Sequence, residues 1–234
     1  MYQFTEGIVE AFKLIISLDP YLIGIVLLSL KVSGMAVLLS TIIGVPLGTY
    51  LGMKPEGKTG FISRVLYTLM GMPPVVAGLL IFMLISRRGP LGPLGILYTP
   101  TAMVTAQVFL ALPIVVGLTM LAIRARGREV EETALTLGAA PMLTAWTVIR
   151  ESRVSILGAI VTGFGRIIAE VGAVMIVGGN IQGQTRVMTT AIVLETSKGN
   201  FELAIGLGIV LLTISFIINS VLYRFQKGGG RHTW

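Results

Sequence analysis

Five long apolar stretches constrain the fold of this sequence more than any other feature. A helix needs roughly 20 apolar residues, at about 1.5 Å each, to cross the hydrocarbon core of a bilayer. A chain with 54% hydrophobic residues, 12% charged residues and a mean hydropathy of +0.88 could not bury all this surface in one soluble core. We therefore predict an all-α, polytopic membrane protein with about five transmembrane helices, at Tyr21–Tyr50, Phe61–Ile85, Pro100–Ile123, Val154–Gly178 and Phe201–Tyr223.

The basic residues are divided unevenly between the segments that connect these spans. Of the 18 lysines and arginines, eleven fall on one side, five on the other and two inside spans. The positive-inside rule places the richer side in the cytoplasm, so we expect the N-terminus outside and the C-terminus in the cytoplasm. The eleven are Lys54, Lys58, Arg64, Arg124, Arg126, Arg128, Arg150, Arg153, Arg224, Lys227 and Arg231.

The two ends of the chain are expected to lie outside the membrane domain. The N-terminal segment lacks the cationic leader and the small-residue cleavage site of a signal peptide. Apolar residues recur in it at helical spacing from Phe4 to Ile16, which favours an interfacial outer helix over residues 1–19. Residues 20–225 then form one membrane domain and residues 226–234 a cytoplasmic tail. The absence of cysteine excludes disulfides and thiolate metal sites.

The segment GMKPEGKT, Gly52 to Thr59, satisfies the phosphate-binding pattern G-x-x-x-x-G-K-[ST]. That pattern carries chemistry only when a buried strand leads into the loop and a helix leaves it. Here the segment is expected to be a short turn with Pro55 in its middle, joining two membrane helices with neither the strand nor the helix of the motif. We interpret it as a basic cytoplasmic loop, which implies that any ATP is hydrolysed on another chain.

The connection from Arg124 to Arg153 is too long and too polar for a simple turn. It is predicted to form two short helices separated at Gly138-Ala-Ala-Pro141, because glycine ends helices and proline starts them. Three glutamates, Glu129, Glu131 and Glu132, would lie in the first turn of the first helix, where the helix dipole favours them. Ala134 and Gly138 would share one face and leave a flat strip. The connection is either a docking site for a partner or an amphipathic hairpin on the membrane surface.

The residues of this connection resemble a known family. Glu132-Thr-Ala134, with Gly138 six positions after the glutamate, is similar to the E-A-A-x-x-x-G loop of ABC-transporter permeases, in which the first helix enters a cleft of the ATPase subunit. Thr133 departs from that pattern, as does the segment from Val148 to Glu151, where the family has I-x-L-P. The resemblance implies that the residues coupling the chain to the ATPase are Glu131, Glu132, Ala134, Leu137, Gly138 and Ala139.

The resemblance extends along the chain from about Pro20. The blocks that begin SLKVSGMAVLLSTIIGVPLG, GMPPVVAGLLIFMLISRRGP and AEVGAVMIVGGNIQGQ are similar to the permeases of tungstate-uptake ABC systems, close to those for molybdate and sulfate. This implies the core of a type I ABC importer permease, a homodimer in the cell membrane, two ATPase subunits that hold ATP and Mg, and an external oxyanion-binding protein. It implies no cofactor on this chain and no nucleic-acid partner.

Several residues inside the spans are candidates for an ion path. Gly71, Pro73, Pro74 and Gly78 are expected to interrupt the second span and Pro113 the third, and such breaks face either a water-filled cavity or other protein. Arg166 and Glu170 are spaced i,i+4 in the fourth span. Charges there should pair, or point into the bundle or a cavity. They form either a structural salt bridge or a pair whose arginine, once released, attracts a passing dianion.

The segment from Gly178 to Thr196 combines glycine-rich turns with hydroxyl and amide side chains. Thr189 and Thr190, with neighbouring backbone N–H groups, are candidates for an outer gate, and a re-entrant connector with ordinary helix caps is the alternative. Two other classes of protein are disfavoured. A membrane kinase or phosphatase needs clustered cytoplasmic carboxylates, and an ion-coupled transporter needs several intramembrane acids or an inverted repeat.

Overall fold

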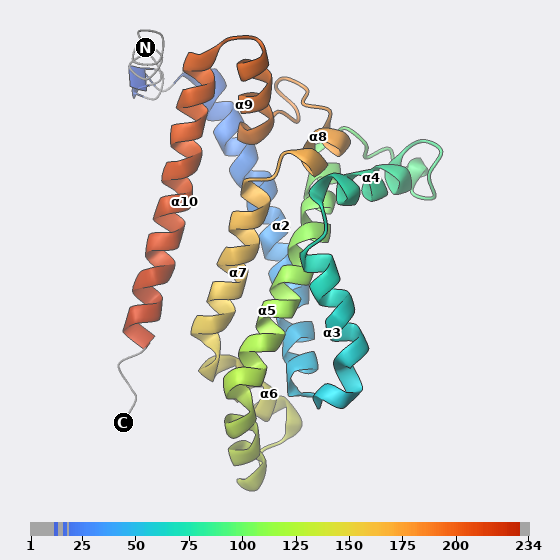
Figure 1. The fold of residues 1–234 in the computed structure, drawn as a ribbon, viewed down its shortest axis with the longest axis vertical. Coiled ribbons are helices and arrows are strands. Elements are labelled where there is room, and N and C mark those ends of the chain that lie inside the picture. The colour runs from blue at the N-terminus through green and yellow to red at the C-terminus, as the bar shows by residue number, and fades with distance from the viewer. Residues whose placement is uncertain (1–11, 14–15, 18, 230–234) are drawn as a thin grey trace. The chain divides into compact units, whose positions relative to one another are not determined.

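The computed structural model describes residues 12–13, 16–17 and 19–229, which form helices joined by short connections (Figure 1). This described part of the chain contains no strand, as the all-α prediction requires. The interfacial helix expected over residues 1–19 lies largely outside it. The helices are α2 (Pro20–Met53), α3 (Glu56–Met70), α4 (Pro74–Ile85), the 3-10 turn η1 (Gly92–Leu94), α5 (Pro100–Thr136), α6 (Pro141–Glu151), α7 (Arg153–Ile168), α8 (Gly172–Gly178), α9 (Met188–Ser197) and α10 (Phe201–Gly229).

The predicted number of spans agrees with these helices. Three stretches are long and apolar enough to cross a membrane, namely Pro20–Met53, Pro100–Ala125 and Phe201–Val221. Two bent pairs also qualify, Thr59–Met70 with Pro74–Ile85 and Arg153–Ile168 with Gly172–Gly178, and counting each pair as one interrupted span gives up to five. The last helix continues to Gly229, beyond the expected start of the tail at residue 226.

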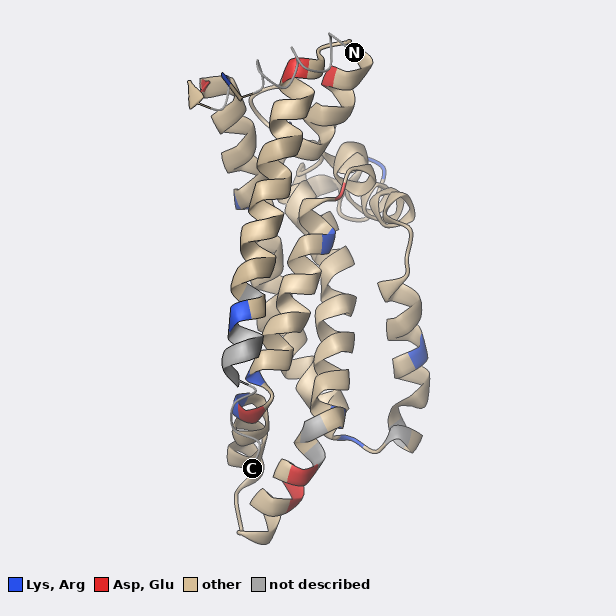
Figure 2. Ribbon diagram, turned by 60° about the vertical axis from the view of Figure 1, so that its left-hand side comes forward, with Lys and Arg blue, Asp and Glu red and all other residues tan. Residues whose placement is uncertain are grey.

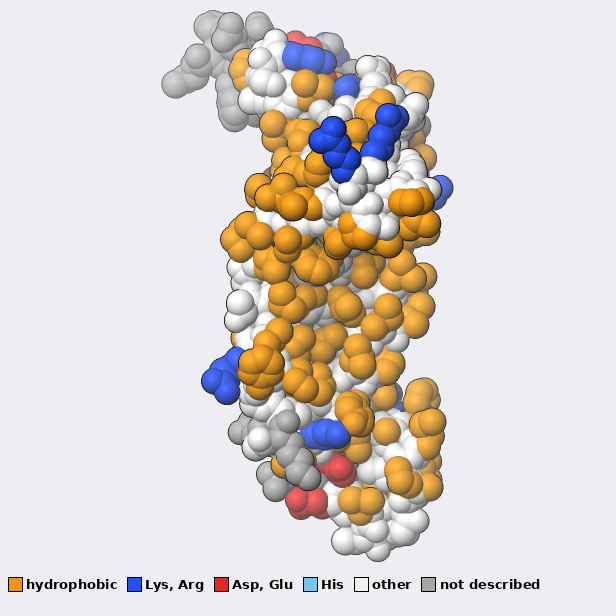
Figure 3. All heavy atoms as spheres, turned by 90° about the vertical axis from the view of Figure 1, so that its right-hand side faces the viewer, with side chains coloured by type: hydrophobic (Ala, Val, Ile, Leu, Met, Phe, Trp, Pro, Cys, Tyr) orange, Lys and Arg blue, Asp and Glu red, His pale blue; other side chains and the backbone are white. Residues whose placement is uncertain are grey.

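Large apolar side chains remain exposed along the helices. Figure 3 shows them over much of the face in view, and Figure 2 shows few charged residues along the ribbon of the longer helices. A water-soluble domain seldom exposes apolar patches of this extent, whereas a lipid-facing surface requires them. On α4 alone the exposed side chains are Val75, Val76, Leu79, Leu80, Met83 and Leu84.

The chain divides into two compact units. Unit 1 contains residues 1–36, 73–107 and 166–217, and unit 2 contains residues 37–72, 108–165 and 218–234. The division passes through α2, α5, α7 and α10, so each unit combines segments that are far apart in the sequence.

In unit 2, a stripe of three glycines lets α2 pack closely against α5. Gly44, Gly48 and Gly52 are four residues apart and therefore lie on one face of α2. A Cβ added at Gly48 would lie only 2.7 Å from the Cβ of Thr119. Small residues at this spacing allow helix backbones to approach closely in membranes. The nearest side-chain atoms to such a Cβ belong to Val115 for Gly44, Thr119 for Gly48 and Ile123 for Gly52.

The same unit has an apolar cluster that joins α5, α6 and α7. Ile123, Val148 and Ile156 form its centre and are each at most 5% exposed. Gly127 lies directly beneath α6, because a Cβ placed there would be 2.8 Å from Cγ1 of Val148. Apolar burial and a glycine contact thus fix α6 against α5.

In unit 1, α4 and α8 pack side by side (Figure 1). Gly78 lies inside α4 and does not interrupt it, contrary to the prediction. Its role is close packing, because a Cβ there would be 2.6 Å from Cα of Ala173. Pro113 does not interrupt its helix either, since α5 runs continuously past it. The second span is interrupted at Gly71–Pro73, between α3 and α4.

The glycine stripe predicts that replacing glycine by alanine destabilises the protein at a packed position of α2 but not at an open one. Gly48→Ala should lower the free energy of unfolding by about 1–3 kcal/mol, because the added methyl group clashes with Thr119. Gly34→Ala on the same helix is the matched control: its Cβ meets nothing within 4 Å, so only the higher helix propensity of alanine acts there. Thermal unfolding of the detergent-solubilised proteins measures both. Equal stability of the two variants would contradict the close packing.

Candidate functional site

The connection predicted to dock a partner lies in unit 2 and differs from the expected pair of short helices. Its first part continues the long helix α5, which ends only at Thr136. Between Ile123 and Thr136 the sequence offers one weak breaker, Gly127, which the packing of α6 accommodates. Glu131 and Glu132 therefore lie near the C-terminal end of a helix, and the predicted stabilisation by the helix N-terminus is wrong.

The predicted break between the two helices is confirmed and has a definite geometry. Gly138 adopts φ of 76°, a conformation that glycine tolerates best. The Ala139 N–H donates to the carbonyl of Ala134, and the Gly138 N–H donates to that of Leu135. These two bonds form a Schellman motif that ends α5, and Pro141 then opens α6.

The residues expected to contact an ATPase differ in exposure. Leu137 is 82% exposed, Glu132 and Gly138 are exposed, Glu131 and Ala139 are partly buried, and Ala134 is only 9% exposed. Ala134 and Gly138 do not form a flat helical strip, because Gly138 has left the helix. The accessible surface instead contains several large apolar side chains, which are Leu135, Leu137, Met142, Leu143 and Trp146.

A groove of about 720 Å³ separates the end of α5 from α6. Its lining includes Ala134, Leu137, Gly138 and Ala139, so it contains four of the six predicted coupling residues. The hairpin of α5 and α6 thus presents an apolar tip together with an adjacent groove. Such a surface is suited to receive a protein partner.

The phosphate-binding pattern has a structural explanation in unit 2. No strand precedes it, as predicted, but a helix does follow, because α3 begins at Glu56 and contains Gly57 to Thr59. Its first glycine, Gly52, belongs to the stripe packed on α5. Its last residue, Thr59, accepts a hydrogen bond of 2.7 Å from Nη2 of Arg124. These residues therefore serve helix packing.

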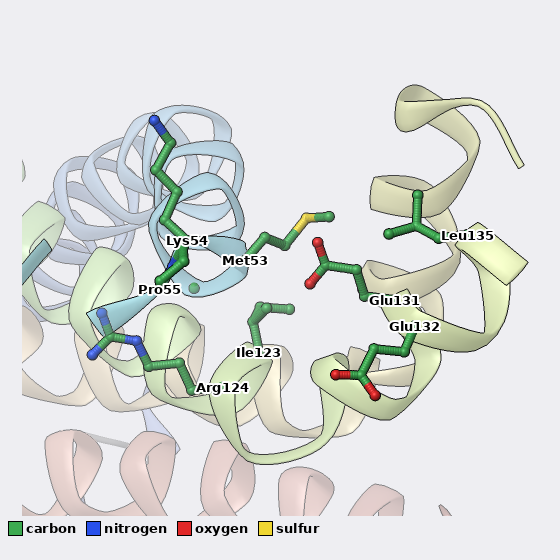
Figure 4. Close-up of a pocket in the computed structure, with 9 residues that line it drawn as sticks. Met53, Lys54, Pro55, Ile123, Arg124, Glu131, Glu132 and Leu135 are labelled. Carbon is green, nitrogen blue, oxygen red and sulfur yellow. The ribbon is translucent and has the colours of Figure 1, made fainter. Parts of the chain in front are cut away.

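A cavity of about 450 Å³ lies beside this pattern (Figure 4). Glu131 and Glu132 line it together with Lys54 and Arg124. In Figure 4 the Glu131 carboxylate points toward Met53, and the Lys54 ammonium points away from the acidic pair. The two carboxylates offset the two basic side chains, so the cavity has no excess of positive charge to attract a phosphate.

In unit 1, the structure brings two helix breaks together. A Cβ added to Gly172, the first residue of α8, would lie 2.7 Å from Cγ2 of Val75 in the first turn of α4. Pro73 and Pro74 precede that valine, and Glu170 precedes that glycine by two residues. Four of the six predicted path residues therefore belong to this region: Pro73, Pro74, Glu170 and Arg166 in the last turn of α7.

The sequence indicated that Glu170 lies on a continuous helix with Arg166. In the structure it lies in the break between α7 and α8. It is 5% exposed, and its Oε1 accepts a hydrogen bond of 3.1 Å from the Ala173 N–H. Its Oε2 lies 3.8 Å from Nη1 of Arg166, whose side chain is 42% exposed. The i,i+4 pair is present but long, and the carboxylate also satisfies a backbone donor of α8.

The two predicted threonines are buried, and their hydroxyl groups are bonded internally. Thr189 donates a hydrogen bond of 2.8 Å to the backbone oxygen of Glu170, which links α9 to the break after α7. Thr190 accepts from the Val187 N–H and donates to the Val187 oxygen at the start of α9. Thr190 therefore acts as a helix cap, as the alternative interpretation proposed.

Sequence reasoning missed two residues that shape these sites. Gln107 is 3% exposed, and its Nε2 donates to the backbone oxygen of Ile167 at 3.1 Å, while its Oε1 has no hydrogen-bond partner among the described residues. Arg124 joins α5 to α3 through Thr59 and Ser63. The sequence did contain a signal for Gln107, because an isolated amide side chain in an apolar span indicates a buried hydrogen bond.

Comparison with known proteins identifies the family. Residues 44–228 match the model of the binding-protein-dependent transport system inner membrane component. The chain belongs to this family. As a member of it, the chain is 44% identical to the tungstate uptake system permease protein TupB of Peptoclostridium acidaminophilum, over 97% of this chain and 100% of that protein.

Two further similarities extend the family assignment. The molybdenum transport system permease protein ModB of Azotobacter vinelandii is 30% identical over 86% of this chain and 94% of its own length. Among solved structures, a bacterial alginate ABC transporter in complex with an alginate-bound periplasmic protein has a chain that superposes with a TM-score of 0.66 at 16% identity, covering 95% of this chain and 86% of that chain. The family fold therefore agrees with the arrangement described above.

The capping role of Glu170 leads to a test with two substitutions. Glu170→Leu should lower the free energy of unfolding by about 1–3 kcal/mol, because it leaves the buried Ala173 N–H without an acceptor. Glu170→Gln keeps an oxygen at that position and should retain most of the stability. Melting temperatures in detergent distinguish the two. If both variants lose the same stability, the charge pair with Arg166 is the dominant interaction and the capping role is wrong.

Proposed function

We propose that this chain is the transmembrane permease subunit of an ATP-driven importer for tetrahedral oxyanions, with tungstate as its substrate. The observation that carries the proposal is the 44% identity to a tungstate permease along 97% of the chain. Molybdate is the second candidate, because a molybdenum permease is 30% identical over most of the chain. In this proposal the chain is a multi-pass protein of the cell membrane, with its N-terminus outside and its C-terminus in the cytoplasm.

The ion path is proposed to pass the region where the two helix breaks of unit 1 meet. Freed backbone groups and polar side chains are tolerated in a membrane where they face protein or a water-filled cavity. Arg166 supports this placement, because its side chain is 42% exposed and its Nη1 lies 3.8 Å from Oε2 of Glu170, which is a long ion pair. It can attract a dianion, while Thr189 and Glu170 hold the break in shape. One chain of five spans encloses half a path, so the functional unit is a homodimer.

The hairpin of α5 and α6 is proposed to dock an ATPase subunit, one for each permease chain. Leu137 and Met142 at its tip are 82% and 83% exposed, which is unfavourable in water unless a partner covers them. ATP and Mg belong to that partner. Because the hairpin continues α5, a force on its tip acts on a helix that also belongs to the membrane domain.

An external binding protein is proposed to deliver the oxyanion and to provide most of the selectivity. A permanent high-affinity site in the permease would oppose release of the ion, since conduction needs sites that ions can also leave.

The substrate is tested with the assembled transporter in sealed vesicles. ATP-dependent uptake of tungstate is expected, with molybdate competing weakly and sulfate least. Stronger uptake of molybdate than of tungstate would replace the first candidate by the second. Absence of ATP-dependent uptake of all three ions, in a complex that hydrolyses ATP, would refute the proposed substrate class.

The docking surface predicts a selective effect of Leu137→Ala. Removing an exposed apolar side chain should leave the melting temperature unchanged but weaken copurification of the ATPase at least fivefold, the consequence of losing about 1 kcal/mol at an interface. Leu157→Ala on α7 is the matched control, because Leu157 is 40% exposed outside the hairpin. Unaltered ATPase binding by the Leu137 variant would place the docking surface elsewhere.

A further inference from the structure

Unit 1 contains a cavity of about 410 Å³ at the N-terminal part of α2, away from the helix breaks. One wall is a single face of α2 that includes Tyr21, Gly24, Leu28 and Lys31. The opposite wall is the connection between α8 and α9, which contributes Gly183 and Arg186. The cavity is apolar except for one lysine, one arginine and one tyrosine.

The connection that forms the second wall is attached to α2 at two points. Arg186 donates a hydrogen bond from Nη1 to the hydroxyl group of Tyr21. Two residues later, the Met188 N–H donates to Oγ of Ser29 at 2.8 Å. The cavity residue Gly24 lies between these two points along α2, so hydrogen bonds join the two walls on either side of it.

Arg186 is itself held in place within this connection. It is 9% exposed, and its Nε and Nη2 donate to the side chain and the backbone oxygen of Asn180. Thr185 braces the same turn through bonds to Gly178 and Ile181. The guanidinium therefore lines the cavity in one orientation, which lowers the entropy cost of binding an anion.

The charges around the cavity leave a positive excess. Hydrogen bonding from Lys198 holds the pKa of Glu195 below its usual range, and Arg186 adds to this effect, so the single negative charge of Glu195 faces two positive charges, of which Lys198 is the nearer ion-pair partner at 3.0 Å. Lys31 has no such partner among the described residues. A lysine inside a span is costly unless its charge is paired or reaches the interface.

The position of Lys31 indicates what type of anion would pair with it. It lies ten residues after Tyr21, about 15 Å further along α2, and its side chain is exposed. A lysine at this depth extends toward the interface, where its ammonium can meet a headgroup. Next to it Leu27, 60% exposed, also lines the cavity and offers a surface for an acyl chain.

We propose that this cavity binds the phosphate headgroup of an anionic phospholipid, contacted by Lys31 and Arg186, with the acyl chains lying along Leu27 and Leu28. A soluble oxyanion would gain nothing from the apolar wall, whereas a lipid uses both the charges and the leucines. The site does not depend on which ion the protein transports.

The test measures lipid retention by the full-length chain. The protein is purified from membranes, exchanged into mixed micelles of phosphatidylglycerol and phosphatidylcholine, and examined by native mass spectrometry. The native chain should retain phosphatidylglycerol in preference to phosphatidylcholine. Lys31→Met should reduce that preference about fivefold, the usual effect of one basic residue at a membrane surface. Lys54→Met removes a lysine from the other end of α2 and should not reduce it.

A second pair of variants tests the cavity without changing any charge. Gly24→Leu should fill the cavity and abolish the preference, because a Cβ at Gly24 meets nothing within 4 Å and the leucine can enter without a clash. Gly34→Leu, at an equally open position of α2 that does not line the cavity, should leave the preference unchanged.

Three results would overturn the proposal. The first is equal retention of the two lipids by the native chain. The second is retention that neither Lys31→Met nor Gly24→Leu alters. The third is displacement of the lipid by millimolar tungstate or inorganic phosphate, which would identify a site for soluble anions. Because none of these measurements depends on uptake, failure of the lipid site and failure of the transport proposal are distinguishable.

Discussion

The need to satisfy every backbone polar group inside hydrocarbon determines where this chain can place polar side chains. Helices meet the need along most of each span, but not at the break after Ile168. There the structure supplies side chains as partners: Gln107 donates to the Ile167 oxygen, Thr189 donates to the Glu170 oxygen, and Glu170 accepts from the Ala173 N–H. These buried polar groups therefore stabilise the interrupted span. A role in transport would be additional to this structural one.

In unit 2 the packing stabilises a long helix without a break, the part of α5 from residue 108 to its end at Thr136. The glycines of α2 allow α5 to pack closely against that helix, and Gly127 allows the same for α6. Gly117 of α5 lies against the sulfur of Met70 at the end of α3. Arg124 adds polar contacts to α3 through Thr59 and Ser63. In the proposed transporter, a displacement of the hairpin would therefore act on α5 and on the helices packed along it, because no flexible joint separates the hairpin from α5.

Periodicity and composition predicted the spans well, because a lipid-facing helix must be apolar over its whole length. The break at Gly138 to Pro141 was also predictable, since both residues act through local backbone geometry. Tertiary contacts were not. Nothing local shows that Gly78 packs against Ala173 or that Pro113 is accommodated within α5. Likewise, the i,i+4 spacing of Arg166 and Glu170 suggested one helical face, whereas the chain leaves the helix between them.

The phosphate-binding pattern illustrates why spacing alone is a weak guide to chemistry. A cradle for phosphate needs a strand that ends where a helix begins, so that free N–H groups converge on one point. In this chain the helix α2 precedes the segment. Gly52 lies at the end of α2 and must be small because the side chain of Ile123 packs against it. Thr59 accepts a hydrogen bond from Arg124, and the adjoining cavity has two carboxylates that offset its two basic side chains. The first and last residues of the pattern, Gly52 and Thr59, are thus explained by their contacts with α5, whereas a Cβ at Gly57 would meet nothing within 4 Å, so the match in spacing gives no support to a nucleotide site.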